Sequence, residues 1–188
     1  MTINDCALMK NIPILAKYLT TLQETSKDNH NNTAIYMTNS NLEVVNFDLV
    51  KNEYCKNLGL DNVASSVDAL FFKEENIYFI EFKNGRIEKN EVVKKMYDSL
   101  LMFSDISQKD ISYFRKHLHF ILVYNDEKVK EDDFVLRQKH HIQESYNRSF
   151  INSHIKIKNK YDFAKYQELY FKSVNMKTSN ELIPFLIQ

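Results

Sequence analysis

The sequence predicts a mixed α/β fold in which helices flank a central β-sheet. Between residues 65 and 124 the expected elements follow in the order strand, strand, helix, strand, which is typical of a mixed α/β sheet. The strands expected at 76–83 and 117–124 are apolar on both faces over most of their length. Strands of this kind lie inside a sheet that is covered on both sides. We therefore expect a single domain spanning residues 1–188 around such a sheet.

The N-terminal part of the chain predicts a helix followed by a hairpin. Pro13 begins the helix, and apolar residues follow at helical spacing as far as Leu22. The apolar segments 34–38 and 42–47 flank the sequence Asn-Ser-Asn, a combination that favours a β-hairpin.

The rest of the chain supplies the remaining elements. A helix is expected over 48–58, because an aspartate begins it and a glycine follows it. The strand before 76–83 is expected at 65–73, and a helix with an apolar stripe at 88–104. The C-terminal part is expected to be mainly helical, most clearly at 161–174.

Composition and charge limit the function classes. The chain is 44% hydrophobic and 27% charged, with two glycines, two prolines and a formal net charge of zero, which is ordinary for a globular protein. Cys6 and Cys55 lack metal-ligand spacing and are expected to be reduced thiols. The sequence MTINDCALMK lacks the basic and apolar regions of a signal peptide, and no apolar run suits a membrane helix. These observations predict a cytoplasmic protein that does not bind membranes.

The strands 65–73 and 76–83 predict a hairpin that brings two carboxylates together. If the chain turns about Glu74-Glu75, Leu70 faces Phe79, and Asp68 faces Glu81. Directly opposed residues share a face of the sheet, with Cβ atoms roughly 4.5 to 5.5 Å apart. The register that matches the apolar residues therefore also pairs Asp68 with Glu81, with Lys83 one step further along.

Opposed carboxylates destabilise a half-buried sheet unless their repulsion is relieved. The pair could share a proton, Lys83 could neutralise one member, or a divalent cation could bridge them, because Mg²⁺ and Mn²⁺ select carboxylate oxygens. Alternatively, the three residues form a surface ion cluster at a solvated end of the strands. Spacing alone leaves these alternatives open.

Asp68 followed by Glu81-Phe82-Lys83, on adjacent strands before a helix, resembles the PD-(D/E)XK nuclease superfamily. The resemblance implies a restriction-endonuclease-like core of one helix, three antiparallel strands, a second helix and a further strand, here within residues 48–124. It also implies Mg²⁺- or Mn²⁺-dependent hydrolysis of phosphodiester bonds in DNA or RNA, as an endonuclease.

The resemblance assigns roles to individual residues. Asp68 and Glu81 would hold the cation, together with the backbone carbonyl of Phe82. Lys83 would position the attacking water and stabilise the charge that develops on the phosphate. Glu53 corresponds to a glutamate that many members carry on the helix before the strands, and it would position metal or water.

The sequence departs from the family pattern in two places. Val67 stands where the family name has proline, although many members lack it. The first of the three strands would have to lie near 60–66 or come from the N-terminal hairpin. Glu43 is a weaker candidate than Glu53, and Glu91 or Lys94 could face the site from the following helix.

A basic segment near the C-terminus could bind a phosphate backbone, because Lys and Arg supply most of the affinity for nucleic acid. A solvated face is the alternative explanation. A homodimer would suit cleavage of two strands, although no residue pattern indicates one. The basic residues of this segment are Arg137, Lys139, Arg148, Lys156, Lys158 and Lys160.

Two other functions remain open from the sequence. The chain could be a catalytically degenerate module that keeps the nuclease fold and holds nucleic acid or a partner protein. The neutral net charge favours this alternative. His117 and His119 could instead form a zinc site with His140-His141, since His-x-His on a strand can bind metal. No cysteine or carboxylate falls at convincing spacing beside these histidines.

Overall fold

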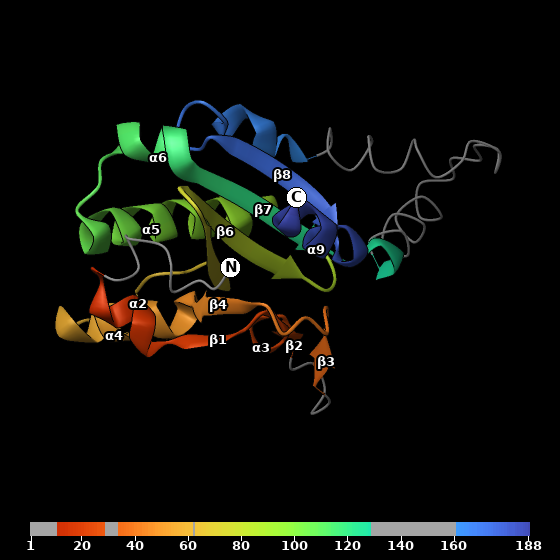
Figure 1. The fold of residues 1–188 in the computed structure, drawn as a ribbon, viewed down its shortest axis with the longest axis horizontal. Helices are drawn as coiled ribbons and strands as arrows, with labels where there is room; N and C mark the ends of the chain where they lie inside the picture. Colours follow the sequence, from red (N-terminus) through yellow and green to blue (C-terminus); the bar gives the residue numbers. More distant parts are fainter. Residues whose placement is uncertain (1–10, 29–33, 62, 129–160) are drawn as a thin grey trace.

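The computed structural model describes residues 11–28, 34–61, 63–128 and 161–188. These residues form a mixed α/β architecture with helices packed on a central sheet (Figure 1). The elements, in chain order, are α2 (Pro13–Lys17), β1 (Leu19–Thr21), α3 (Leu22–Thr25), β2 (Lys27–Asp28), β3 (Ile35–Tyr36), β4 (Glu43–Asn46), α4 (Phe47–Asn57), β5 (Ala69–Lys73), β6 (Asn76–Lys83), α5 (Lys89–Ser107), α6 (Ile111–His117), β7 (Leu118–Tyr124), the 3₁₀ helix η3 (Phe163–Tyr166), β8 (Ser173–Thr178) and α9 (Ser179–Ile187).

Within the described residues, the main sheet has six strands in the order β1-β4-β5-β6-β7-β8. Pairing is antiparallel from β1 to β6 and parallel from β6 to β8. The two strands that are apolar on both faces, β6 and β7, lie inside the sheet, which confirms the prediction made from their composition.

The predicted hairpin register is confirmed where β5 and β6 pair. Leu70 lies opposite Phe79, and Phe72 lies opposite Ile77. All four side chains are buried, and the two-residue turn between Lys73 and Asn76 sets their pairing, because loop length fixes the register of a hairpin. The same register governs the polar end of the hairpin.

The core is aromatic on the face of the sheet that carries Phe72 and Phe79. Phe103 of α5 has its ring centroid 5.7 Å from that of Phe79 and 6.4 Å from that of Phe72. The rings of Phe47 and Phe114 also contact the Phe103 ring, with centroid distances of 6.2 and 5.5 Å. These contacts anchor α5 over β5 and β6 (Figure 1).

The other face of the sheet is covered by α9. Lys73 and Lys177 lie on the face opposite to Phe79 by strand alternation. Lys73 Nζ donates to the Leu186 carbonyl at 3.2 Å, and Lys177 Nζ lies 4.6 Å from the centroid of the Phe185 ring. Helices therefore pack on both sides, as the apolar strands predicted.

The expected N-terminal hairpin is wrong. The segment 34–38 contributes β3, which pairs with β2, whereas β4 pairs with β1 and β5. The expected first helix is also shorter, because α2 ends at Lys17 and the Tyr18 carbonyl accepts from the Asn46 amide at 2.9 Å. Pairing between segments distant in sequence overrides the local hairpin signal here.

The helix expected most clearly at 161–174 is wrong. These residues contain the short η3 and the first two residues of β8, an edge strand parallel to β7. Met176 is the one buried side chain of β8. The strand alternates polar and apolar residues, but Val174 and Met176 are its only apolar members, so the signal in the sequence is short.

The first of the three expected antiparallel strands is β4, which comes from the segment assigned to the N-terminal hairpin and not from residues 60–66. β4 pairs with β5, and residues 63–68 lie outside any strand. Because β4 precedes α4, the order differs from the helix-first core that the resemblance implies. The restriction-endonuclease-like core therefore stays a prediction.

Two further expectations from the sequence concern membrane helices and the basic segment. None of its helices is both long and apolar enough to cross a membrane. The basic segment cannot be evaluated, because Arg137, Lys139, Arg148, Lys156, Lys158 and Lys160 all lie outside the described residues.

Candidate functional site

The site lies where β5 and β6 separate. After Ala69 and Ile80, the next hydrogen-bonded pair of this register would be Val67 with Phe82. Instead, the Phe82 amide donates to Asp68 Oδ2 at 2.6 Å, and the Val67 amide donates to Ser99 Oγ of α5 at 2.9 Å. The Phe82 carbonyl therefore loses the partner that the ladder would have given it.

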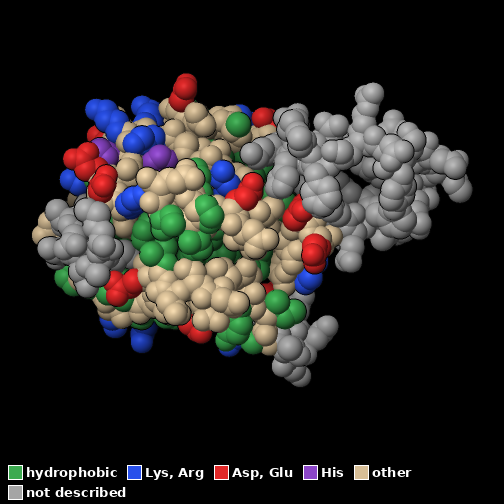
Figure 2. Space-filling view, turned by 45° about the vertical axis from the view of Figure 1, so that its right-hand side comes forward, with side chains coloured by type: hydrophobic (Ala, Val, Ile, Leu, Met, Phe, Trp, Pro, Cys, Tyr) green, Lys and Arg blue, Asp and Glu red, His purple; other side chains and the backbone are tan. Residues whose placement is uncertain are grey.

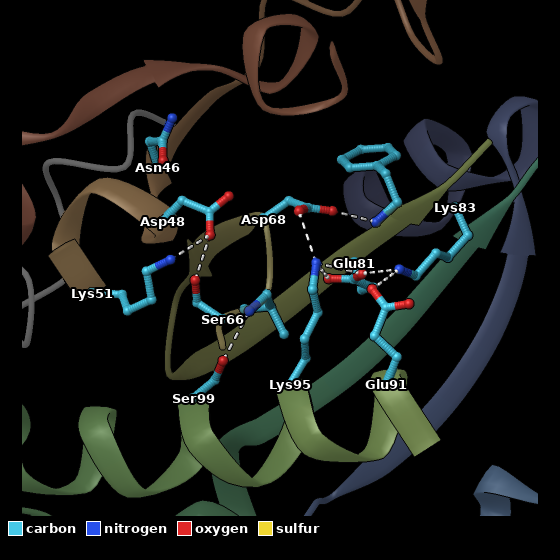
Figure 3. A network of polar contacts seen from close by, with 12 residues as sticks. Asn46, Asp48, Lys51, Ser66, Asp68, Glu81, Lys83, Glu91, Lys95 and Ser99 are labelled. Atoms are coloured by element: carbon cyan, nitrogen blue, oxygen red, sulfur yellow. Dashed lines mark hydrogen bonds and ion pairs between the residues drawn. The ribbon is translucent and has the colours of Figure 1, made fainter. Parts of the chain in front are cut away.

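Glu81 is the buried centre of the site. Its side chain has 0% exposure and points toward α5 (Figure 3). Lys95 Nζ of α5 lies 2.7 Å from Glu81 Oε1, 3.0 Å from Glu81 Oε2 and 3.4 Å from Asp68 Oδ1. Asp68 and Glu81 thus converge on one ammonium group, as their opposed positions predicted.

Lys83 lies on the same side of the sheet. Its Nζ is 3.3 Å from Glu81 Oε1 and 2.6 Å from Glu91 Oε1. The hydrogen bond from Lys83 holds the pKa of Glu91 below its ordinary value. The structure therefore brings Asp68, Glu81 and Lys83 together, with Glu91 as the residue that orients the lysine.

The carboxylate that α4 brings to this region is Asp48. Its Oδ1 accepts from the hydroxyl of Ser66, two residues before Asp68, and lies 3.6 Å from Lys51 Nζ. Figure 3 shows Asp48 beside Asp68. Its negative charge acts on both Asp68 and Lys95.

Glu53 lies on the same helix and has different partners. Its Oε2 accepts from Lys17 and from the Tyr18 hydroxyl, and these bonds lower the pKa of Glu53. Among the described residues, no hydrogen bond or ion pair links Glu53 to Asp68, Glu81 or Lys83. The predicted role of Glu53 therefore remains without structural support.

Burial determines the electrostatics of the two central carboxyls. Burial raises the pKa of Asp68 to about 6, against the attraction of Lys95 and the Phe82 amide. Burial and the charge of Asp68 together raise the pKa of Glu81 to about 8. Burial acts to lower the pKa of Lys95, but the attraction of Asp68 and Glu81 outweighs it and the net pKa is raised. The site thus favours a proton or another cation near Glu81.

Lys95 is the residue that sequence reasoning missed. Lys94 was the lysine considered on this helix, and it is exposed. At 3.6 residues per turn, Lys95 borders the arc defined by the buried Val92, Met96 and Ser99, whereas Lys94 lies opposite that arc. The helical wheel alone could have selected Lys95.

Of the histidines suggested as zinc ligands, the structure describes His117 and His119, which contact different groups. His119 Nδ1 contacts Ser173 Oγ at 2.7 Å, and its Nε2 contacts Asn76 Oδ1 at 3.2 Å, so both ring nitrogens are engaged. His117 Nδ1 lies 3.0 Å from the Glu75 carbonyl. Burial, with the nearby Lys172, lowers the pKa of His119 to about 4. The suggested partners His140 and His141 lie outside the described residues.

Glu43 is remote in its contacts from this network. It pairs with Thr21 in the sheet, and its Oε1 is buried without a hydrogen-bond partner. Among the described residues, no hydrogen bond or ion pair joins Glu43 to Asp68 or Glu81.

Comparison with known proteins supplies no relative. No family model matches the chain, and neither the curated proteins nor the solved structures contain a match. Any assignment of function therefore depends on the chemistry of the site.

A divalent cation is chemically compatible with this donor set. Glu81 Oε1 is buried, and its neighbours are the ammonium groups of Lys95 at 2.7 Å and Lys83 at 3.3 Å, so it lies where positive charge is favoured. No group of three or more His, Cys, Asp or Glu side chains suited to a metal occurs in the described part of the chain. The available donors are Asp68, Glu81 and the Phe82 carbonyl. Mg²⁺ is commonly held by one or two carboxylates with water and substrate phosphate completing its shell.

Proposed function

We propose that the chain is a Mg²⁺- or Mn²⁺-dependent nuclease that hydrolyses phosphodiester bonds of DNA or RNA. The observation that carries this proposal is the convergence of Asp68 and Glu81 at the separated ends of β5 and β6, with Lys83 on the same side. The resemblance to the PD-(D/E)XK superfamily assigns the same residues to this chemistry.

Each residue of the site would have its own role in holding the cation or the phosphate. Asp68 Oδ1, Glu81 and the Phe82 carbonyl would hold the cation, which would supply activation of water and stabilisation of phosphate oxygens. The Phe82 amide keeps Asp68 oriented through its 2.6 Å hydrogen bond. Lys83, held by Glu91, would place a fixed positive charge near the reacting phosphate.

Binding of the nucleic acid would have to be local. Figure 2 shows one face of the molecule, on which Lys and Arg side chains lie interspersed with Asp and Glu. A mixed surface of this kind gives little sequence-independent attraction for a polyanion. The proposal also includes a contribution to nucleic-acid binding from the segment that contains Arg137 to Lys160. It further includes a homodimer and a cytoplasmic location.

A cleavage assay tests the activity. Supercoiled plasmid, single-stranded DNA and RNA would be incubated with the protein in EDTA, Mg²⁺ or Mn²⁺. We expect cation-dependent cleavage of at least one substrate, and its loss in Glu81→Gln. The control is Glu88→Gln, because Glu88 is exposed and pairs with Arg86 away from the site.

One observation favours a second function. Lys95 already supplies a positive charge to both carboxylates, as a module that holds nucleic acid or a partner protein without catalysis would allow. A melting experiment separates the two functions. An increase in melting temperature with Mn²⁺ that Asp68→Asn removes indicates a metal site, because only a ligand of the folded state stabilises it. No increase in either protein indicates the module.

A further inference from the structure

The ammonium group of Lys95 lies where the two carboxylates come closest together. It contacts both oxygens of Glu81 and one oxygen of Asp68, at distances between 2.7 and 3.4 Å. The side chain of Glu81 is fully buried, and those of Asp68 and Lys95 are 17% and 18% exposed. Of the two carboxylates, Lys83 contacts Glu81 alone, at 3.3 Å, so Lys95 is the cation shared by both that makes their burial tolerable when no metal is bound.

A divalent cation shared by Asp68 and Glu81 would need the same space. Glu81 is carried by β6 and Asp68 directly precedes β5, whereas Lys95 is carried by α5. A lysine amine is a point charge at the end of a flexible four-carbon stem, so it can leave without movement of the helix. The sheet would keep the carboxylates in place during that exchange.

Two acidic groups could receive the displaced amine. Glu91 is one helical turn before Lys95, and its side chain is 50% exposed. Asp48 of α4 already attracts Lys95, and its side chain is 47% exposed. The amine would therefore remain beside the site after it leaves Glu81.

We propose that Lys95 is a displaceable internal counter-ion, which neutralises Asp68 and Glu81 in the metal-free protein and must move out when a divalent cation binds. This proposal rests on the proposed metal site and adds its regulation. Lys95 competes with the metal for the same oxygens and repels it electrostatically. The apparent affinity for the cation is consequently lower than the carboxylates alone would give.

The first experiment measures Mn²⁺ binding by calorimetry at about pH 8 in wild type, Lys95→Met and Lys94→Met. We expect Lys95→Met to bind Mn²⁺ about tenfold more tightly or better, which corresponds to the loss of one modest competing interaction. Lys94 is adjacent and exposed, so Lys94→Met should bind as wild type does. In EDTA, Lys95→Met should melt at a lower temperature than either of the other proteins.

The outcomes distinguish this inference from the proposed function. If wild type binds Mn²⁺ and Lys95→Met binds it equally or more weakly, the counter-ion proposal is wrong and the metal site stands. If wild type, Lys95→Met and Lys95→Gln all fail to bind Mn²⁺, both the metal site and this inference are overturned. Lys95→Gln keeps a hydrogen-bond donor and serves if the methionine variant does not fold.

A second experiment needs no variant. Acetylation of lysines by an amine-reactive ester, followed by peptide mass spectrometry, reports how accessible each amine is. We expect Mn²⁺ to accelerate acetylation of Lys95 severalfold while Lys94 keeps its rate. Unchanged or slower acetylation of Lys95 in a protein that binds Mn²⁺ would show that the amine does not leave.

Discussion

The two ends of the β5–β6 hairpin use the same geometry for different purposes. At one end Leu70, Phe72, Ile77 and Phe79 pair in register, and the rings of Phe72 and Phe79 contact Phe103. At the other end the ladder opens, and side chains replace backbone partners. The first end supplies apolar burial that stabilises the sheet. The second end holds like charges together, which lowers the stability of the fold. Such clusters of charges are common at functional sites.

The largest effect on stability is expected at the apolar end. Phe79→Ala would remove a fully buried ring that contacts Phe47 and Phe103, and should lower the free energy of unfolding by about 3–5 kcal/mol. Chemical denaturation in EDTA measures this loss. A loss well below 1 kcal/mol would show that the aromatic cluster does not hold the hairpin.

A smaller effect on stability is expected at Ser99, where the ladder opens. Ser99 is buried and accepts from the Val67 amide. Ser99→Ala leaves that amide without its acceptor and should cost about 1–3 kcal/mol. Ser104→Ala is a matched control on the same helix, because the Ser104 hydroxyl donates to the Lys109 carbonyl at the other end of α5. Equal losses in the free energy of unfolding for the two variants would show that the hydrogen bond between Val67 and Ser99 contributes no more than the one between Ser104 and Lys109.

The polar end should show an unusual dependence on pH. The pKa of Glu81 is raised from 4.5 to about 8, so between these values the folded state binds a proton that the unfolded state does not. The free energy of unfolding therefore falls as the pH rises through this window. Asp68 contributes with the same sign between 3.8 and about 6.

Glu81→Gln isolates this contribution, because glutamine cannot ionise. The variant should lose most of the decline between about pH 6 and pH 8, and should be more stable than wild type at the upper end. Urea denaturation at a series of pH values in EDTA measures both slopes. Parallel slopes in the two proteins would mean that Glu81 is already ionised throughout this range.

The smallest effect is expected at Glu53. Its carboxylate is bound by Lys17 and Tyr18, and exposed pairs contribute little to stability. Glu53→Gln should leave the Mn²⁺ response of the melting temperature unchanged, whereas Asp48→Asn should alter it. The reverse result would restore Glu53 to the site and remove Asp48 from it.

The difference between the hairpin ends also explains what could be predicted. The two-residue turn at Glu74-Glu75 determined the register of β5 and β6, so the meeting of Asp68 and Glu81 followed from the sequence. The pairing of β1 with β4 joins segments that carry no local signal for each other, and β8 is an edge strand with little apolar character. Lys95 was missed because a lysine beside a buried arc is normally solvated.

Three successive contacts bind the segment before β5 to α5. The Ser65 amide donates to Asp98 at 2.8 Å, the Val67 amide donates to Ser99, and Asp68 contacts Lys95. Ser65 and Val67 therefore lie outside any strand, yet their amide protons are held by side chains of the helix. Their hydrogen exchange should follow the opening of α5 from the sheet and not the fraying of β5. These two amides would give a spectroscopic record of how often the helix lifts away from the carboxylates beneath it.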